Sequence, residues 1–116
     1  MASLIDNFRI CKDAVLRYTP NRMPVTTLVL AYDYGAKGPD GCRPTQFVEA
    51  ELWGPRAERL IDSLKKGKDV YCVIDDPYVD PFVRKDGSAG GTLIGKINQI
   101  KPGKRVMAGN EQEQEA

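Results

Sequence analysis

Residues 46–64, QFVEAELWGPRAERLIDSL, constrain the fold of this chain most strongly, because one periodicity replaces another within them. In the first half, apolar and polar residues alternate, which is the pattern of a strand with one face on a core. Val48, Ala50 and Leu52 form the apolar set. The second half starts with a Gly-Pro pair and continues with apolar residues at helical spacing. The segment therefore predicts a strand over 47–53 that leads directly into a helix.

Two aromatic residues lie on the opposite, polar face of that strand. Phe47 and Trp53 share this face with two glutamates. Spaced aromatic side chains on an accessible sheet face suit stacking with the bases of single-stranded nucleic acid, since every base has a π-face. The alternative is that a loop or a subunit contact covers both rings, because aromatic residues are common there too. The alternation alone leaves both interpretations open.

The helix is predicted to begin at Pro55, because a proline at the first helical position loses no hydrogen bond. Apolar residues then recur at i, i+3, i+4 and i+7, which gives the helix one apolar stripe facing a core. Lysines suit its C-terminal end, and Gly67 is a natural stop. The residues of the stripe are Ala57, Leu60, Ile61 and Leu64.

The other elements follow from β-branched and aromatic runs and from turn residues. A tight turn is predicted from Arg17 to Asn21, and a long loop from Gly35 to Pro44. A hairpin arm interrupted by prolines is predicted over residues 76–89, with its tip at Lys85–Ser88. The remaining predicted strands cover residues 4–10, 25–34, 70–74 and 91–101.

Three strands, a helix and two more strands form the order of the OB-fold. This all-β fold with one helix is a five-stranded Greek-key barrel, and the helix lies between strands 3 and 4. We expect residues 1–103 to form one OB-fold, nucleic-acid-binding domain. We expect residues 104–116 to form a short disordered acidic tail.

Composition argues against an enzyme. The chain has no histidine, which removes the commonest general base and most zinc and iron sites. Its three cysteines form no CxxC pair, and it has no glycine-rich phosphate-binding motif. We therefore expect no catalytic residues, no metal and no cofactor. The lack of a long apolar run and of a signal-peptide pattern predicts a cytoplasmic protein without a membrane segment.

The net charge of +1 is unevenly distributed along the chain. The last seven residues carry three of the 16 acidic side chains, so residues 1–109 hold 17 basic and 13 acidic ones, a net charge of +4. A mildly basic body fits a polyanionic partner, although many other proteins have a similar balance.

Several motifs resemble the bacterial single-stranded DNA-binding protein family, in the order and at the spacing of that family. RYTP at Arg17–Pro20 resembles a turn of the family, and RKDGS at Arg84–Ser88 resembles the turn in its hairpin arm. ELWGPRAERLIDSLKKGKDVY at Glu51–Tyr71 is similar to its strand–glycine–helix–KKG–strand segment. The resemblance covers about residues 4–101. It implies single-stranded DNA binding in replication, recombination and repair.

The resemblance also implies which side chains contact DNA. The family stacks bases on aromatic residues at positions that match Phe47, Trp53 and Phe82, and Tyr34 lies near a fourth such position. It further implies a homo-oligomer, either a dimer or a tetramer, with replication or recombination proteins as additional partners. About half of the basic candidates are expected to contact phosphates. These candidates are Arg9, Lys12, Arg17, Arg22, Lys37, Arg43, Arg84 and Lys85.

The chain also departs from that family and resembles a divergent or minimal member. Glu49 and Glu51 lie between the stacking candidates, where a groove for phosphates favours basic residues. The final NEQEQEA lacks the Pro-Phe tip through which the family recruits partners. A second function is therefore kept open, an OB-fold protein-interaction module similar to the primosomal replication protein, with weak or no DNA binding. Adjacent Asp75 and Asp76 suit a magnesium site poorly, because neighbouring strand residues point to opposite faces.

Overall fold

The computed structural model describes residues 2–103, which form six strands and one short helix. The strands are β1 (Ser3–Ile10), β2 (Val15–Tyr18), β3 (Pro24–Asp33), β4 (Thr45–Trp53), β5 (Asp69–Val83) and β6 (Ala89–Pro102). Helix α1 (Pro55–Leu60) and a 3₁₀ turn (Ile61–Ser63) lie between β4 and β5. The tail predicted for residues 104–116 lies outside the described residues, and the domain boundary stays a prediction.

The strands close into a ring. They pair in the order β1-β5-β6-β4-β3-β2, and a second pairing of β1 with β3 completes the closure. Every pairing is antiparallel except that of β4 with β6. β1 and β2 both lie along β3 and share one position, so the ring has the five positions of the OB-fold. The predicted all-β barrel with one helix is therefore confirmed.

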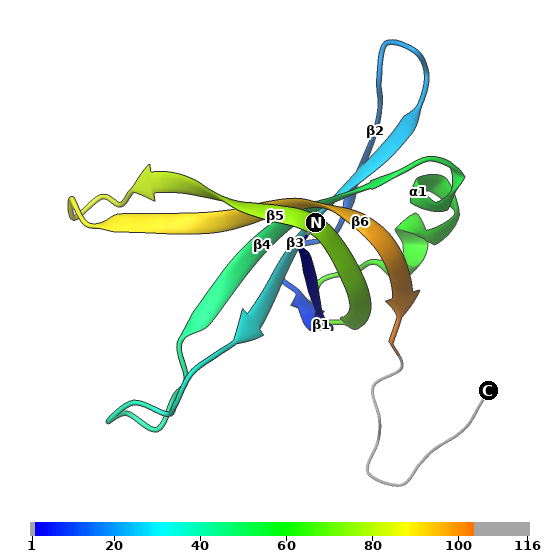
Figure 1. The fold of residues 1–116 in the computed structure, drawn as a ribbon. Helices are drawn as coiled ribbons and strands as arrows, with labels where there is room; N and C mark the ends of the chain where they lie inside the picture. Colours follow the sequence, from blue (N-terminus) through cyan, green and yellow to red (C-terminus); the bar gives the residue numbers. More distant parts are fainter. Residues whose placement is uncertain (1, 104–116) are drawn as a thin grey trace, which may run out of the picture.

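The ring is uneven, because hairpins extend far beyond it (Figure 1). Figure 1 shows the β5–β6 arm and the β3–β4 hairpin projecting away from the end of the barrel that carries α1. The predicted hairpin arm is thus the outer half of two long strands, β5 and β6, that also belong to the barrel. This continuity fixes the arm to the ring, and the pairing of β6 with β4 extends into the arm as far as Leu93, the register partner of Val79.

The turn predicted from Arg17 to Asn21 begins two residues too early. Arg17 and Tyr18 belong to β2 and pair with β3. The reversal follows Tyr18, where Arg22, at a φ of 64°, donates its backbone N–H to Thr19 O at 2.8 Å. Turn residues are recognised from local sequence alone, so they did not show that Arg17 and Tyr18 pair with β3.

The helix is shorter than its apolar stripe predicts. α1 ends at Leu60, and a 3₁₀ turn to Ser63 replaces the continuous helix expected up to Leu64. Ala57 and Leu64 are fully buried, whereas Leu60 and Ile61 are half-buried. The 3₁₀ turn changes the rotation per residue, so Leu64 enters the core from the segment after it.

No helix among the described residues is long and apolar enough to cross a membrane.

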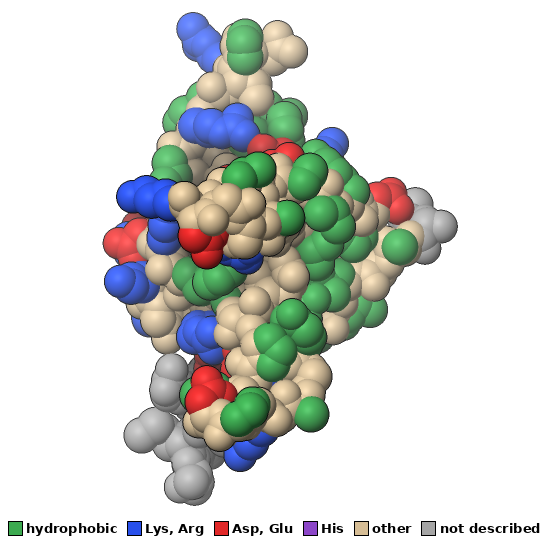
Figure 2. Space-filling model, turned by 90° about the vertical axis from the view of Figure 1, so that its left-hand side faces the viewer, with side chains coloured by type: hydrophobic (Ala, Val, Ile, Leu, Met, Phe, Trp, Pro, Cys, Tyr) green, Lys and Arg blue, Asp and Glu red, His purple; other side chains and the backbone are tan. Residues whose placement is uncertain are grey.

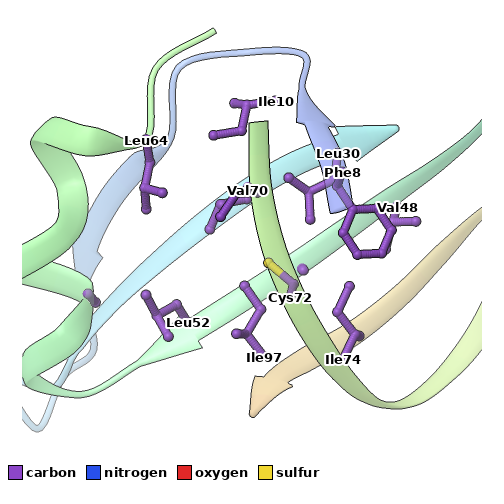
Figure 3. Close-up of a cluster of buried hydrophobic side chains, with 13 residues drawn as sticks. Phe8, Ile10, Leu30, Val48, Leu52, Leu64, Val70, Cys72, Ile74 and Ile97 are labelled. Atoms are coloured by element: carbon purple, nitrogen blue, oxygen red, sulfur yellow. The ribbon is translucent and has the colours of Figure 1, made fainter. Parts of the chain in front are cut away.

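The core fills the inner face of the ring. Figure 3 shows side chains from several strands pointing toward one another, with Leu64 at one end of the cluster. None is more than 6% exposed, and the predicted inward set of β4 is fully buried. Burial raises the pKa of the Cys72 thiol to about 12, which agrees with a role as a small core residue. The cluster consists of Phe8, Ile10, Leu28, Leu30, Val48, Ala50, Leu52, Ala57, Leu64, Val70, Cys72, Ile74 and Ile97.

Candidate nucleic-acid interface

β4 presents the predicted row of aromatic and acidic side chains on the outside of the ring. Phe47 and Trp53 are 47% and 39% exposed, while the alternate residues between them are buried. The two residues lie roughly 20 Å apart along the strand, at about 3.3 Å per residue. Neither ring is buried beneath a loop of the described residues. Both are therefore accessible to a ligand in this chain.

Strand pairing extends this face onto β6 and β5, because residues in register point to the same side of a sheet. Glu49 is in register with Ile94, and Ile94 with Tyr78. Further along the arm, Phe82 is in register with Gly90. Tyr78 and Phe82 are 60% and 44% exposed. We call this surface the aromatic face, and its four rings belong to Phe47, Trp53, Tyr78 and Phe82.

Polar contacts hold Trp53 in place. Its indole Nε1–H donates to Glu51 Oε1 at 3.3 Å, and Arg17 donates to Glu51 Oε2 at 2.7 Å within an ion pair. From β6, the Lys96 ammonium lies 5.4 Å from the centroid of the Trp53 ring, a cation–π contact. Glu51 is thus paired with a cation and orients the ring. An acidic residue at this position therefore supports the aromatic side chain beside it.

Phe82 is held differently, near the outer end of the β5–β6 arm. The Arg84 guanidinium carbon lies 5.3 Å from the ring centroid, and Arg84 also donates to Ala89 O. Opposite, a Cβ on Gly90 would lie 2.6 Å from Phe82 Cε1 and 2.7 Å from Arg84 Cζ. The absence of a side chain at Gly90 therefore leaves the space that the ring and the guanidinium occupy.

The predicted turn at the tip of this arm is confirmed. Arg84 donates its backbone N–H to Ser88 O at 2.8 Å, and Gly87 takes a φ of 89°. Asp86 Oδ1 accepts hydrogen bonds from the backbone N–H and the hydroxyl of Ser88, at 2.9 and 2.6 Å. These bonds stabilise the carboxylate and lower the pKa of Asp86.

Tyr34 does not join the aromatic face. It follows β3 by one residue, so by strand alternation it lies on the same face as Tyr32. Ala31, the register partner of Phe47, lies on the opposite face. Tyr32 faces inward and packs edge-on against Phe8, with ring centroids 5.8 Å apart. The Tyr34 ring is exposed at the start of the loop to Pro44. A base contact there stays a prediction.

The eight basic candidates fall into two groups of four. Arg9 forms an ion pair with Asp33 at 3.8 Å, and Arg43 donates to two backbone carbonyls at the base of its loop. Together with Arg17 and Arg84, they already bind other parts of the chain. The other four side chains are exposed and make no hydrogen bond or ion pair within residues 2–103. They are Lys12, Arg22, Lys37 and Lys85.

Charged and apolar side chains are segregated on the surface. Figure 2 looks toward the tip of the β5–β6 arm and shows Lys and Arg side chains mostly on one side of the molecule. Hydrophobic side chains gather on the other side of the same view. A polyanion that also stacks its bases would contact surfaces of both kinds.

Two residues of this candidate interface, Tyr78 and Lys96, were not predicted from the sequence. Tyr78 lies four residues before Phe82, so an alternation of two counted backward from Phe82 would have found it. Pro77 obscured this pattern, because proline predicts an interruption of the strand. No spacing could reveal Lys96, since its contact with Trp53 depends on the parallel pairing of β4 with β6.

Comparisons with known proteins confirm the family resemblance stated from the sequence. The model of the Single-strand binding protein family matches residues 8–73. The single-stranded DNA-binding protein of Caldanaerobacter subterraneus subsp. tengcongensis is 42% identical over 60 residues, which are 52% of this chain and 40% of that protein. Single-stranded DNA-binding protein 3 of Streptococcus agalactiae serotype V is 41% identical over 59 residues, which are 51% and 43% of the two chains. The matched segment is thus less than half of each relative.

A solved structure has a similar fold. The crystal structure of the small single-stranded DNA-binding protein from Streptomyces coelicolor matches with a TM-score of 0.69 and 17% sequence identity. The match covers 88% of this chain and 94% of that one. At this identity the likeness concerns the path of the backbone, and it supports the OB-fold assignment.

Proposed function

This chain belongs to the single-strand binding protein family, and on that premise we propose that its aromatic face binds single-stranded DNA without catalysing a reaction. Bases stack on Phe47, Trp53 and Phe82, and Tyr78 is a further platform. The proposal rests on one observation, that exposed rings from β4 and β5 share one continuous sheet face. Stacking on such rings contributes about 1–3 kcal/mol per base.

Phosphates bind to the cations around these rings. Lys96 adjoins Trp53 and Arg84 adjoins Phe82, so each of these platforms has a positive charge beside it. The four unengaged side chains, Lys12, Arg22, Lys37 and Lys85, extend the basic surface. Since phosphate contacts release counterions, the affinity falls steeply as the salt concentration rises.

A protein-interaction module with weak DNA binding is the less favoured function. Its support was the acidic character of Glu49 and Glu51 together with the short tail, which lies outside the described residues. Arg17 pairs with Glu51 at 2.7 Å, and Glu51 in turn accepts a hydrogen bond from Trp53. Glu51 is therefore compensated, whereas Glu49 makes no hydrogen bond or ion pair within residues 2–103.

We also propose a homo-oligomer, a dimer or a tetramer, assembled through β1. Within the described residues, 3–8 pair with β5 along one edge only, and Ile5 on this strand is exposed. An open strand edge is a template for pairing with a second copy. Light scattering after size exclusion should give two or four chain masses, whereas a monomer would contradict the proposal. We place this assembly in the cytoplasm, with replication or recombination proteins as further partners.

Fluorescence of Trp53, the single tryptophan of the chain, tests the DNA-binding proposal. Oligo-dT and then a duplex are titrated at low and at moderate salt. We expect strong quenching by oligo-dT, little by the duplex, and loss of the quenching as salt rises. Absence of quenching at low salt, together with unchanged anisotropy of a labelled oligo-dT, would rule out the proposed function.

A further inference from the structure

β4 and the β5–β6 arm separate where the arm leaves the ring. On this side of the ring, the backbone pairing of β4 with β6 ends at Val48 and Leu93. Figure 1 shows the β3–β4 hairpin and the arm pointing in different directions beyond this point. Phe47 lies just outside the paired segment on β4, and Phe82 lies on the arm. Within residues 2–103, no backbone ladder therefore connects the outer part of β4 directly to the arm.

The side chain of Gln46 bridges the gap between the two strands. Its Nε2 donates to Gly91 O on β6 at 3.0 Å and to Phe47 O on β4 at 2.9 Å. Both partners are acceptors, so the amide nitrogen faces them, and its two hydrogens allow both bonds at once. If the parallel register continued outward by two residues, Gln46 would lie opposite Gly91. The side-chain amide thus continues the connection between the strands where the backbone ladder has ended.

Strand β5 offers no substitute for the bond to Gly91. The register partner of Gly91 on β5 is Pro81, which has no N–H to donate. Gln46 is half-buried, and its bond to Gly91 is partly shielded from water. Removal of the amide would leave a partly desolvated carbonyl oxygen without this donor, which is costly. The bridge therefore favours one arrangement of the arm relative to β4.

We infer that Gln46 is a positioning residue for single-stranded DNA binding, which holds the arm so that one strand reaches Phe47 and Phe82 together. The inference rests on the proposed DNA binding and adds a residue on the face opposite the rings. Gln46 adjoins Phe47 in β4, and Gly91 adjoins Gly90, the register partner of Phe82. The bridge thus joins the backbone beside one ring to the backbone beside the partner of the other. Platforms that are preorganised bind a strand more tightly, because less freedom is lost on binding.

Gln46→Met tests this role, because methionine has a similar length and no hydrogen-bond donor. The substitution is combined with Phe82→Ala and, separately, with Trp53→Ala in two double-mutant cycles. Anisotropy of a labelled oligo-dT measures the affinity of every variant at one salt concentration, and circular dichroism verifies the fold. Gln99→Met is the matched control, because Gln99 is an exposed glutamine of β6 that pairs with Val73 in the ring.

We expect Gln46→Met to weaken binding about fivefold, which is the effect of one lost hydrogen bond. In the Phe82→Ala background the same substitution should change the affinity less than about twofold, because no ring remains on the arm end for it to position. In the Trp53→Ala background the fivefold loss should persist, since other contacts hold Trp53 at the far end of β4. Gln99→Met should bind as the wild type does.

Unchanged affinity of Gln46→Met, or a loss that persists in the Phe82→Ala background, overturns the positioning role alone. If Gln46→Met does not fold, Gln46→Glu takes its place in both cycles, because a carboxylate keeps the size of the amide and cannot donate. Gln99→Glu then controls for the added charge. Absence of binding by the wild type, or unchanged affinity in both Phe82→Ala and Trp53→Ala, overturns the proposed function and the positioning role with it.

Discussion

The two halves of β5 differ sharply in burial although they form one continuous strand. From Asp69 to Ile74 the strand lies in the ring, and every second residue is fully buried. From Tyr78 to Val83 every residue is exposed, although pairing with β6 continues up to the turn. The bulge after Asp75 separates the half with buried side chains from the exposed half.

This difference indicates how the fold separates stability from binding. The barrel half is stabilised by burial of apolar side chains. The arm half is held mainly by backbone hydrogen bonds to β6, and an exposed two-stranded ribbon gains little from burial. Its rings, Tyr78 and Phe82, therefore remain available for a ligand. Substitutions in the barrel half should change the free energy of unfolding, and those in the arm half should change DNA affinity.

Ile74→Ala should produce the largest effect, and it tests most directly whether the two halves of β5 differ in their contribution to stability. Ile74 is fully buried, so we expect a loss of about 2–5 kcal/mol in the free energy of unfolding. Val79→Ala, on the exposed half of the same strand, should change it by less than about 0.5 kcal/mol. Urea denaturation followed by circular dichroism measures both. Equal losses would show that the arm belongs to the cooperative core.

Phe82→Ala and Trp53→Ala should each weaken single-stranded DNA binding by about 1–3 kcal/mol, because each removes a stacking platform. Phe82→Ala should barely change the free energy of unfolding, since its ring lies on the exposed arm. Val83→Ala is the control, as an exposed apolar residue on the opposite face of the same arm. Anisotropy of a labelled strand measures the affinities. Unchanged affinity in both aromatic variants would mean that bases do not stack on this face.

Much of this architecture could be predicted because it depends on local periodicity. The alternation in 47–53 correctly separated the buried side chains of β4 from Phe47 and Trp53. The Gly-Pro pair correctly marked the start of α1 at Pro55. The order of these elements was then enough to identify the barrel. Helix length was less predictable, because the helical spacing up to Leu64 does not distinguish an α-helix from one that ends in a 3₁₀ turn.

The details of the interface could not be predicted, because they depend on pairing between distant strands. The contact of Lys96 with Trp53 requires the parallel register of β4 and β6. The ion pair of Arg17 with Glu51 requires β2 to lie along β3. The bulge after Asp75 depends on packing against Gly95, which no local pattern indicates. The sequence could therefore not show whether an acidic residue such as Glu51 hinders DNA binding or supports an aromatic side chain.

Two glycines of β6, the strand paired with β5, test the same difference between the two halves. A Cβ on Gly95 would clash with Ile74 in the barrel half and lie 3.2 Å from Asp75 O, so Gly95→Ala should lose about 1–3 kcal/mol in the free energy of unfolding. Gly90→Ala would instead displace Phe82 and Arg84 in the arm half. It should weaken DNA binding by about 1 kcal/mol, less than the loss of a whole stacked base. Urea denaturation and anisotropy are applied to both variants. If Gly90→Ala lowered the free energy of unfolding as much as Gly95→Ala does, the separation of stability in the barrel half from binding in the arm half would be wrong.

Single lysines should produce the smallest effect, and they test whether DNA follows the arm half alone. Lys85 is exposed at the arm tip, whereas Lys101 is exposed beside Tyr71 in the barrel half. Each phosphate contact to a single strand contributes about 0.7 to the slope of log affinity against log salt. Lys85→Ala should reduce the slope by about this amount, and Lys101→Ala should leave it unchanged, as measured by anisotropy titrations at several salt concentrations. If both variants reduced the slope equally, DNA would cross the barrel half as well, and the two halves of β5 would differ in stability but not in binding.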